Sequence, residues 1–130
     1  KVVVVDDLSN SVEESLNRVR EITSCPEDQL IFRKVNLLDL PALESVFEEF
    51  EFDSCVHFAG LKAVGESVKQ PLLYYRNNIE GTLNLLECMK RRENCRKLVF
   101  SSSATVYGQP DKLPLDEQSS VGVGITNPYG

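Results

Sequence analysis

The amino-acid sequence predicts an α/β fold, a doubly wound parallel sheet with helices on both faces. Short apolar runs alternate four times with stretches of helical periodicity, which is the pattern of consecutive β-α units. After its first lysine, the run at residues 1–5 is entirely β-branched and apolar on both faces, as expected of a parallel strand that is covered on both sides. With 130 residues, 42% of them hydrophobic, the chain is long enough for one domain with a core.

Four strands are expected, and they share short apolar runs that contain β-branched or aromatic residues. They lie at residues 1–5, 30–35, 55–59 and 97–101. Beyond the fourth strand, the sequence is rich in Gly, Pro, Ser and Asp. This composition predicts a long loop that reaches the C-terminus.

Three helices are expected between these strands. Ser11, with Glu14 three residues later, has the spacing of a capping box and predicts the start of the first helix. The second begins after the second strand, with Pro41 in its first turn. The third runs from about residue 71 to 92 and includes Gly81, which permits close packing at a helix cost of about 1 kcal/mol. The apolar face of the first helix is formed by Leu16, Val19 and Ile22, and that of the second by Leu43, Val46, Phe47 and Phe50. The apolar residues of the third helix are Leu72, Leu73, Tyr75, Ile79, Leu83, Leu86 and Met89.

Polar residues after the first two strands are candidate ligand contacts, because ligands of doubly wound sheets bind at the carboxyl ends of the strands. Asp6 and Asp7 follow the first strand. A carboxylate here can accept hydrogen bonds from the adenosine ribose of a dinucleotide, and it favours NAD because it repels the 2′-phosphate of NADP. Acidic residues are equally common in turns. Asp39 could accept from an adenine amino group, but a helix N-cap is the simpler interpretation.

The residues after the third strand suggest a second part of the site. Gly60 lets the backbone approach a ligand closely, and Lys62 could pair with a phosphate, although a lone lysine is usually just solvated. His57 lies inside an apolar run and is interpreted as a core histidine. Asn77 and Asn78 are mildly unfavourable within a helix, which indicates a specific hydrogen bond or simple exposure.

Hydroxyl groups follow the fourth strand and end the chain. Ser101, Ser102 and Ser103 could orient a substrate hydroxyl, or they could simply begin a polar loop. Tyr129 could act as a base only if a nearby cation lowered its pKa strongly, and no cation is adjacent in the sequence. Each of these signals is weak alone, but together they occur in order at the ends of successive strands.

Composition excludes several classes of function. The formal net charge of −6 argues against nucleic-acid binding, which needs clustered cations. The basic residues at 90–92 are interpreted as a solvated helix end, where cations are favoured by the helix dipole. No apolar run approaches the roughly 20 residues that span a bilayer, and the apolar start is too short for a secretion signal. A cytoplasmic protein is therefore expected. Since the first residue is not Met, the true start is expected to lie elsewhere.

The four cysteines are expected to be free thiols, and no metal site is expected. They are Cys25, Cys55, Cys88 and Cys95. None forms a C-x-x-C pair and the chain has a single histidine, so the residues do not fit a zinc site. Without a secretion signal, disulfides are not expected.

Five stretches of the sequence resemble the UDP-glucose (UDP-galactose) 4-epimerases of the extended short-chain dehydrogenase/reductase family. They lie at residues 5–11, 57–68, 77–82, 100–108 and 127–130. The second and fourth, HFAGLKAVGESV and FSSSATVYG, are the most specific. The resemblance implies that residues 1–130 are a partial NAD-binding Rossmann-type domain that lacks the first β-α unit. It covers nearly all of this chain but less than half of a full-length enzyme.

The resemblance also implies roles for individual residues. The cofactor NAD would contact Asp6, Asp7, Asn10, Ser11, Asp39, Leu40, Phe58, Ala59, Gly60, Lys62 and Asn78. Ser103 and Tyr129 would be catalytic, and together with Thr105 they would contact the substrate, UDP-galactose or UDP-glucose. In the family, the tyrosinate takes the proton of the sugar 4-hydroxyl while a hydride passes from C4 to NAD. The 4-keto sugar then rotates and receives the hydride on its other face. This reaction belongs to galactose metabolism.

The chain departs from the family pattern in ways that affect its expected behaviour. The glycine-rich phosphate loop would precede residue 1, and the lysine that lowers the tyrosine pKa would fall four residues after Tyr129, beyond the last residue. This chain has Asp7 where the family often has Asn, and Leu38 where the family usually has Gly before the aspartate. Without the first strand, the first and fourth strands of this chain would have unpaired edges. The isolated chain is therefore expected to be inactive and to fold poorly, aggregate or need a partner.

Two alternatives to an epimerase remain. A sugar-nucleotide 4,6-dehydratase would carry Thr-Asp-Glu where this chain has Ser103-Ala104-Thr105, so the acid and base for removing water are absent. A non-catalytic truncated product or nucleotide-binding remnant would also fit a chain without the glycine loop and lysine. The family forms homodimers by packing helices, one of which corresponds to residues 71–92.

Overall fold

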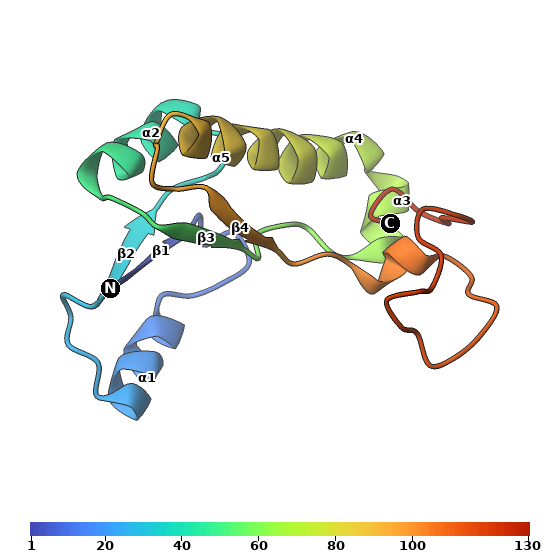
Figure 1. The fold of residues 1–130 in the computed structure, drawn as a ribbon, viewed down its shortest axis with the longest axis horizontal. Helices are drawn as coiled ribbons and strands as arrows, with labels where there is room; N and C mark the ends of the chain where they lie inside the picture. Colours follow the sequence, from blue (N-terminus) through green and yellow to red (C-terminus); the bar gives the residue numbers. More distant parts are fainter.

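The structure, a computed structural model, describes all residues from 1 to 130. Strands and helices alternate along the chain, as predicted (Figure 1). In order, the elements are β1 Val2–Asp6, α1 Glu14–Thr23, β2 Leu30–Lys34, α2 Leu40–Glu49, β3 Ser54–His57, α3 Val64–Lys69, α4 Pro71–Tyr74, a π-helical turn Tyr75–Glu80, α5 Gly81–Lys90, β4 Lys97–Phe100 and a 3-10 turn Ala104–Tyr107.

The four strands are parallel but form two separate pairs. β1 pairs with β2 from Val2 opposite Leu30 onward, and β3 pairs with β4 from Ser54 opposite Lys97 onward. The α/β class with parallel strands is confirmed. The strands form two pairs and not the one sheet that was predicted. Every strand is paired along one edge only, so the unpaired edges expected for the first and fourth strands occur on the second and third strands as well. Unpaired strand edges expose backbone donors and acceptors, which is an aggregation hazard.

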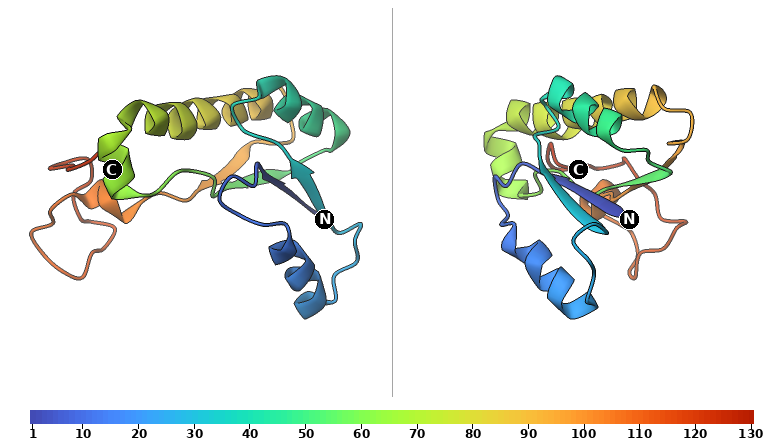
Figure 2. Two further views of the ribbon diagram at one scale, coloured as in Figure 1. Left: turned by 180° about the vertical axis from the view of Figure 1, so that it is seen from behind. Right: turned by 90° about the vertical axis from the view of Figure 1, so that its left-hand side faces the viewer.

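One core joins the two strand pairs. Its buried cluster comes from α2, α5 and the start of the chain segment that leads to β4, and consists of Leu43, Phe47, Leu85, Cys88, Met89 and Cys95. Val5 of β1, Cys55 of β3 and Leu98 of β4 pack against this cluster. The same two helices therefore cover both strand pairs (Figure 2).

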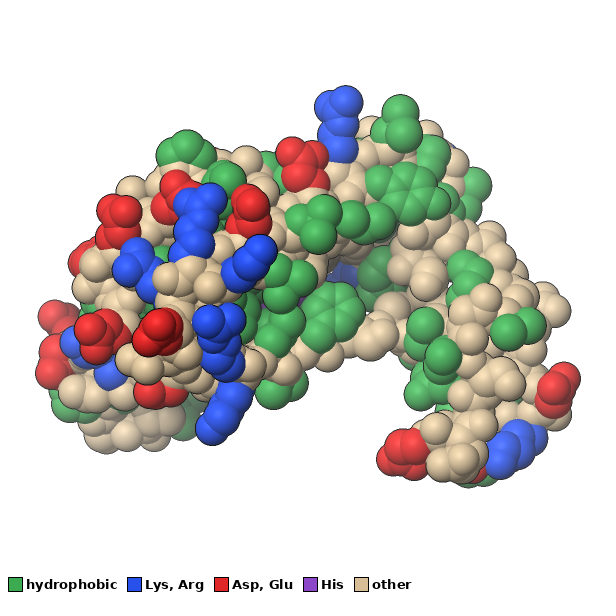
Figure 3. Space-filling view, turned by 45° about the horizontal axis from the view of Figure 1, so that its top comes forward, with side chains coloured by type: hydrophobic (Ala, Val, Ile, Leu, Met, Phe, Trp, Pro, Cys, Tyr) green, Lys and Arg blue, Asp and Glu red, His purple; other side chains and the backbone are tan.

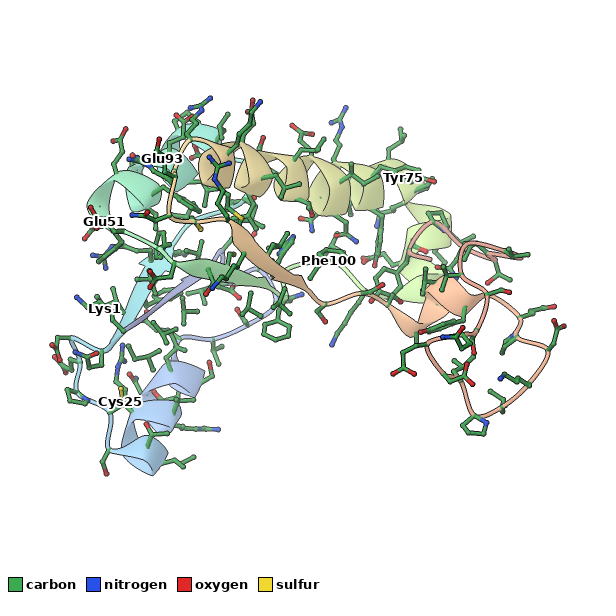
Figure 4. All side chains as sticks on the ribbon, viewed as in Figure 1. Lys1, Cys25, Glu51, Tyr75, Glu93 and Phe100 are labelled. Carbon is green, nitrogen blue, oxygen red and sulfur yellow. The ribbon has the colours of Figure 1, made fainter.

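Helix α1 lies on the other side of the strands from α2 and α5. Figure 4 places Cys25, just after α1, across the strands from the helix that carries Tyr75. α1 has no buried residue, and the predicted apolar face is largely uncovered: Val19 is 43% and Ile22 is 84% exposed. The capping-box prediction was wrong. The helix starts at Glu14 without a side-chain cap, because the Ser11 hydroxyl donates to the Asp6 carboxylate instead.

The second helix follows the prediction more closely. Asp39 is its N-cap, and Pro41 lies in its first turn. Leu43, Val46 and Phe47 are buried, as predicted. Phe50 lies one residue beyond the helix end in an extended conformation, so it was wrongly placed on the helical face.

The third helix runs without interruption from Pro71 to Lys90, but it contains a π-helical turn and is preceded by a short helix, α3. Neither feature was predicted. Gly81 is buried, and a Cβ built there would lie 3.2 Å from the Leu37 Cβ, which confirms the close packing expected at this glycine. α5 can approach the loop after β2 because residue 81 has no side chain.

The segment after β4 folds back on itself near α3 (Figure 1). Its return is fixed at Gly108, which has a φ of 58° and where a Cβ would lie 2.4 Å from the Val123 carbonyl oxygen. The Gly122 N–H also donates to the Val106 carbonyl, at 2.9 Å. The predicted long loop therefore has a defined course that brings the C-terminal residues beside the 3-10 turn.

Candidate functional site

The turn after β1 is organised by its two aspartates. Asp6 ends the strand, and its Oδ1 accepts hydrogen bonds from the Leu8 N–H and the Ser11 hydroxyl, both at 2.7 Å. Asp7 Oδ1 accepts from the Ser9 N–H at 2.8 Å. These bonds stabilise Leu8 at a φ of 59°, a left-handed conformation that costs a residue with a side chain about 1–2 kcal/mol. Asp6 is held with Oδ2 free of protein donors, so this oxygen can accept hydrogen bonds from ligand hydroxyls.

The other predicted residues of this turn shape it from within. Asp7 Oδ2 accepts a hydrogen bond from the Asn36 side-chain amide at 3.0 Å, so both carboxylate oxygens of Asp7 are engaged. The Ser11 hydroxyl donates its hydrogen bond to Asp6. Asn10 is exposed beside them. Within this set, Asp6 alone presents a held and open carboxylate oxygen, while Asp7 ties the first turn to the loop after β2.

Asp39 and Leu40 lie where the loop after β2 enters α2. Asp39 Oδ1 accepts a hydrogen bond from the Ala42 N–H at 3.1 Å, which confirms the helix-cap interpretation. Leu40 is partly buried and packs against the core cluster. Asp39 Oδ2 and the exposed side chain of Leu38 are the groups of this loop that remain open to a ligand.

The loop after β3 is small, exposed and firmly held. Phe58 is 78% exposed, and Ala59, Gly60 and Lys62 are exposed beside it. The Asn78 side chain grips the next residue, Leu61, on both sides: Oδ1 accepts from its N–H and Nδ2 donates to its carbonyl, each at 2.8 Å. Asn78 therefore uses most of its polar capacity inside the protein, and its specific hydrogen bond, expected from its position within a helix, is to the backbone.

His57 is connected through Thr82 to the π-helical turn that carries Asn78. Its Nε2 lies 2.9 Å from the Thr82 hydroxyl, which in turn donates to the Asn78 carbonyl at 2.5 Å. Because the hydroxyl has a single hydrogen, His57 must be the donor in the first of these bonds and carry its proton on Nε2. Burial lowers the pKa of His57, which is 4% exposed. The interpretation of His57 as a satisfied core histidine is confirmed.

Ser103 and Thr105 form a compact hydroxyl pair after β4. Their oxygens lie 2.6 Å apart, and the Ser103 hydroxyl also accepts from the Thr105 N–H at 3.1 Å. Ser103 thereby caps the 3-10 turn Ala104–Tyr107. Ser101 and Ser102 are exposed and make no such bond. The structure thus singles out Ser103 among the three serines that the sequence offered.

Tyr129 reaches this region from the other end of the loop. The Asn127 side chain accepts hydrogen bonds from the backbone N–H groups of Tyr129 and Gly130, at 3.1 and 3.0 Å. A Cβ built at Gly130 would lie 2.9 Å from the Thr105 carbonyl oxygen, so the end of the chain runs directly beside the Ser103–Thr105 pair. The structure therefore brings together the segments that carry the three predicted catalytic and substrate residues.

Tyr74 is a residue of this region that the sequence analysis missed. It is 1% exposed, and its ring packs edge-on against the Tyr129 ring with a centroid distance of 6.4 Å. Its hydroxyl accepts from the Ala63 N–H at 3.0 Å and lies 2.8 Å from the Glu66 carboxylate. Burial and, secondly, Glu66 raise the pKa of Tyr74. The available signal was weak: Tyr74 is a tyrosine that does not belong to the apolar residues predicted for this helix.

The cysteines and the basic cluster add no further site. All four cysteines are free, and burial raises the pKa of Cys55, Cys88 and Cys95. No group of three or more His, Cys, Asp or Glu side chains is placed to hold a metal ion. Arg91, within the basic cluster, pairs with Glu44. Every helix is too short or too polar to cross a membrane.

The class of this protein follows from these features: it is an α/β protein with the arrangement of dinucleotide-binding folds. Its strands are parallel, an open carboxylate follows β1, an exposed loop with Gly60 follows β3, and the Ser103–Thr105 hydroxyl pair follows β4. A family model described as GDP-mannose 4,6 dehydratase matches residues 1–130. The chain belongs to this family.

Individual relatives are named as epimerases. UDP-glucose 4-epimerase 2 of Arabidopsis thaliana is 55% identical over 128 residues, which are 98% of this chain and 36% of that protein. UDP-glucose 4-epimerase of Bacillus subtilis is 53% identical over 130 residues, 100% of this chain and 37% of that protein. The human UDP-glucose 4-epimerase is 51% identical over 134 residues, 98% of this chain and 37% of that protein. The chain therefore spans little more than a third of these relatives.

Solved structures agree with these sequence matches. UDP-glucose 4-epimerase from Bifidobacterium longum, in complex with NAD⁺ and UDP, superimposes with a TM-score of 0.91 and 46% identity, over 99% of this chain and 37% of that one. The enzyme from Stenotrophomonas maltophila, with bound NAD and a formylated UDP-arabinopyranose, gives a TM-score of 0.86 at 40% identity, over 98% of this chain and 36% of that one.

Proposed function

We propose that this chain is part of an NAD-dependent UDP-glucose 4-epimerase, which interconverts UDP-galactose and UDP-glucose in galactose metabolism. The observation that carries the proposal is its 51–55% identity, over almost the whole chain, to proteins named UDP-glucose 4-epimerases. Because the chain spans about 36% of the first of these relatives, the activity belongs to the whole protein. The 130 residues alone are expected to be inactive.

The open carboxylate of Asp6 supports NAD as the cofactor. Its Oδ1 is saturated by the Leu8 N–H and the Ser11 hydroxyl, so the carboxylate cannot turn, and Oδ2 is presented in a fixed direction. Such an oxygen suits the hydroxyls of an adenosine ribose and repels a 2′-phosphate. The exposed loop at Phe58, Ala59 and Gly60, with Lys62 beside it, would line the nicotinamide half.

The hydroxyl cluster supports the chemistry at the sugar. When bound, NAD would supply a reversible hydride acceptor for C4 of the sugar. The Tyr129 phenolate would take the proton of the 4-hydroxyl, and the resulting ketone would receive that proton back after rotation. Ser103, whose hydroxyl is fixed by Thr105, would hydrogen-bond the reacting oxygen and relay the proton. Thr105, next to the chain end, would touch the sugar.

A dehydratase, the activity in the name of the matching family, fits this site less well. Elimination of water needs an acid and a base beside the sugar ring. The 3-10 turn here carries Ala104 and Thr105, and the Thr105 hydroxyl is engaged with Ser103. Epimerisation does not need the Asp and Glu that a dehydratase would carry here, since one tyrosine serves as both base and acid.

The long helix supports a homodimer of the intact enzyme. Its apolar residues recur every three or four positions, so they share one face, and they are exposed by 41–71%. They are Leu72, Tyr75, Ile79, Leu83 and Leu86. Figure 3 shows hydrophobic side chains reaching the surface on the side where this helix lies. The same face on a second copy would bury both, and replacing Ile79 and Leu83 by serine should convert the dimer to a monomer in analytical ultracentrifugation.

A cytoplasmic location fits the thiols. Cys55, Cys88 and Cys95 are free although two of them are buried in one cluster, and disulfides are rare in a reducing compartment. Localisation of a fluorescent fusion of the whole protein would test this.

The decisive experiment transplants the chain into a complete enzyme. In a chimera, residues 1–130 would replace the matching segment of the Bacillus subtilis relative, and UDP-galactose conversion would be assayed. We expect turnover close to that of the parent, and a kcat lower by about 10²–10⁴-fold in the Tyr129→Phe variant. A folded chimera that eliminates water instead of epimerising would support the dehydratase, and one that does neither would contradict both. Calorimetry of NAD with the isolated chain should show no binding.

A further inference from the structure

A hydrogen bond between α5 and the loop after β2 has no role in the proposed reaction. The Asn84 side-chain amide donates to the Leu37 carbonyl at 2.8 Å, across a sequence separation of 47 residues. Asn84 is half-buried, and asparagine is unfavourable inside a helix. Helix stability therefore does not explain why an asparagine stands at position 84. Its hydrogen bond to the loop after β2 does explain it.

The same loop is also held by Asn36. The Asn36 amide donates to Asp7 Oδ2 at 3.0 Å, and its oxygen accepts from the Leu38 N–H at 2.8 Å. Asn36 thus joins this loop to the turn that carries Asp6. The loop after β2 is thus held at two points: Asn36 joins it to the turn after β1, and Asn84 joins it to α5.

The helix is shaped to reach this loop. Gly81 lies three residues before Asn84, so both residues face the same way. A Cβ at position 81 would lie 3.2 Å from the Leu37 Cβ, which means that the backbone of α5 is already in close contact with Leu37. The amide of Asn84 then meets the Leu37 carbonyl directly, without an intervening group.

We propose that Asn84 is a positioning residue for the adenosine half of the dinucleotide site. By fixing the Leu37 carbonyl, it sets where Asp39 and Leu38 stand relative to the open carboxylate of Asp6. Asn36 holds the same loop against the turn that carries Asp6. Asn84 acts through the loop and not by touching the ligand. This inference rests on the proposed function, because it needs a nucleotide to bind at these loops.

The test uses the chimera freed of NAD, with ADP-ribose and UDP as probes in calorimetry. ADP-ribose reports on the adenosine half, while UDP reports on the part of the site supplied by the Bacillus subtilis segment. We expect Asn84→Ala to weaken ADP-ribose binding about 3–10-fold with UDP binding unchanged. Asn84→Asp, which places a carboxylate against the Leu37 carbonyl, should weaken it further. Asn94→Ala, at an exposed asparagine between α5 and β4, is the matched control.

The outcomes separate this inference from the proposed function. If the unmodified chimera fails to bind ADP-ribose, the proposed function is wrong and the inference falls with it. If the chimera binds but Asn84→Ala binds equally well, even with a lower melting temperature, Asn84 is merely structural and the inference alone is overturned. Should Asn84→Ala fail to fold, Asn36→Ala tests the same loop from the other side, with the same loss for ADP-ribose expected.

Discussion

The two faces of the strands look alike in sequence and differ in structure. Helices on both sides have apolar residues at helical spacing, and both were predicted from that pattern. On one side α2 and α5 bury Leu43, Phe47 and Leu85 in a common core. On the other side α1 buries nothing, and its Ile22 is 84% exposed.

The difference teaches what apolar periodicity can determine. It predicts that a segment forms a helix and which side of that helix is apolar. Burial needs a second apolar surface at the right distance. For α2 and α5 that surface is each other and the strands, whereas α1 meets no comparable surface within these 130 residues.

The largest effect is expected on the packed side. Phe47→Ala should lower the free energy of unfolding of the chimera by about 3–5 kcal/mol, because it opens a cavity in the core cluster. Phe50→Ala is the matched control and should lose clearly less, since Phe50 is half-buried beyond the helix end. Urea denaturation measures both, and equal losses would contradict this account of the core.

A smaller effect is expected where α5 meets the loop after β2. Gly81→Val should lower the free energy of unfolding by about 1–3 kcal/mol, because its side chain would overlap Leu37. Gly65→Val in α3 is the control, since a Cβ there meets nothing within 4 Å, and it should change stability by about 0.5 kcal/mol or less. Chemical denaturation of the two variants side by side would decide, and a neutral Gly81→Val would show that the loop can move aside.

A pH effect of moderate size is expected from His57. Burial holds its pKa below the ordinary value of 6.5, so the unfolded chain binds more protons than the folded one below that pH. Stability should therefore be lost as pH falls through about 6.5 and should be unaffected by this group above it. Unfolding of the chimera at pH 5.5 and 7.5 measures the slope. In His57→Gln, which cannot titrate, the slope should be shallower, and an identical slope would exclude His57 as its source.

The smallest effect is expected on the uncovered side. In the chimera, Ile22→Ala should change the free energy of unfolding by about 0.5 kcal/mol or less, because the side chain is 84% exposed. Urea denaturation measures this change, and a loss of about 2 kcal/mol or more would show that another segment of the chimera covers α1.

The fold was predictable as far as local signals reach. Apolar runs located the four strands, Asp39 and Pro41 located the start of α2, and the helix from Pro71 was found in full. The capping box at Ser11 was wrong because the carboxylate of Asp6 competes for its hydroxyl. The π-helical turn was missed because the apolar spacing within residues 71–92 does not distinguish it from an α-helix.

The candidate site was predictable in residue type and only partly in role. Strand ends pointed to Asp6, Gly60 and Ser103, and in the structure each lies at or next to a hydrogen bond that holds its loop. Asp7 and Asn78 make internal hydrogen bonds whose partners the sequence did not identify, because these partners, Asn36 and Leu61, lie on other loops.

The sequence by itself determined the α/β class, the order of the elements and the residues at the ends of the strands, because these depend on composition and spacing within short windows. The tertiary structure decided which side chains stay open to a ligand. Hydrogen bonds between segments that are distant in the sequence engage the second carboxylate oxygen of Asp7, through Asn36, and most of the polar atoms of Asn78, through Leu61. Spacing along the chain carries no record of such bonds, since donor and acceptor meet only after the helices have packed on the strands.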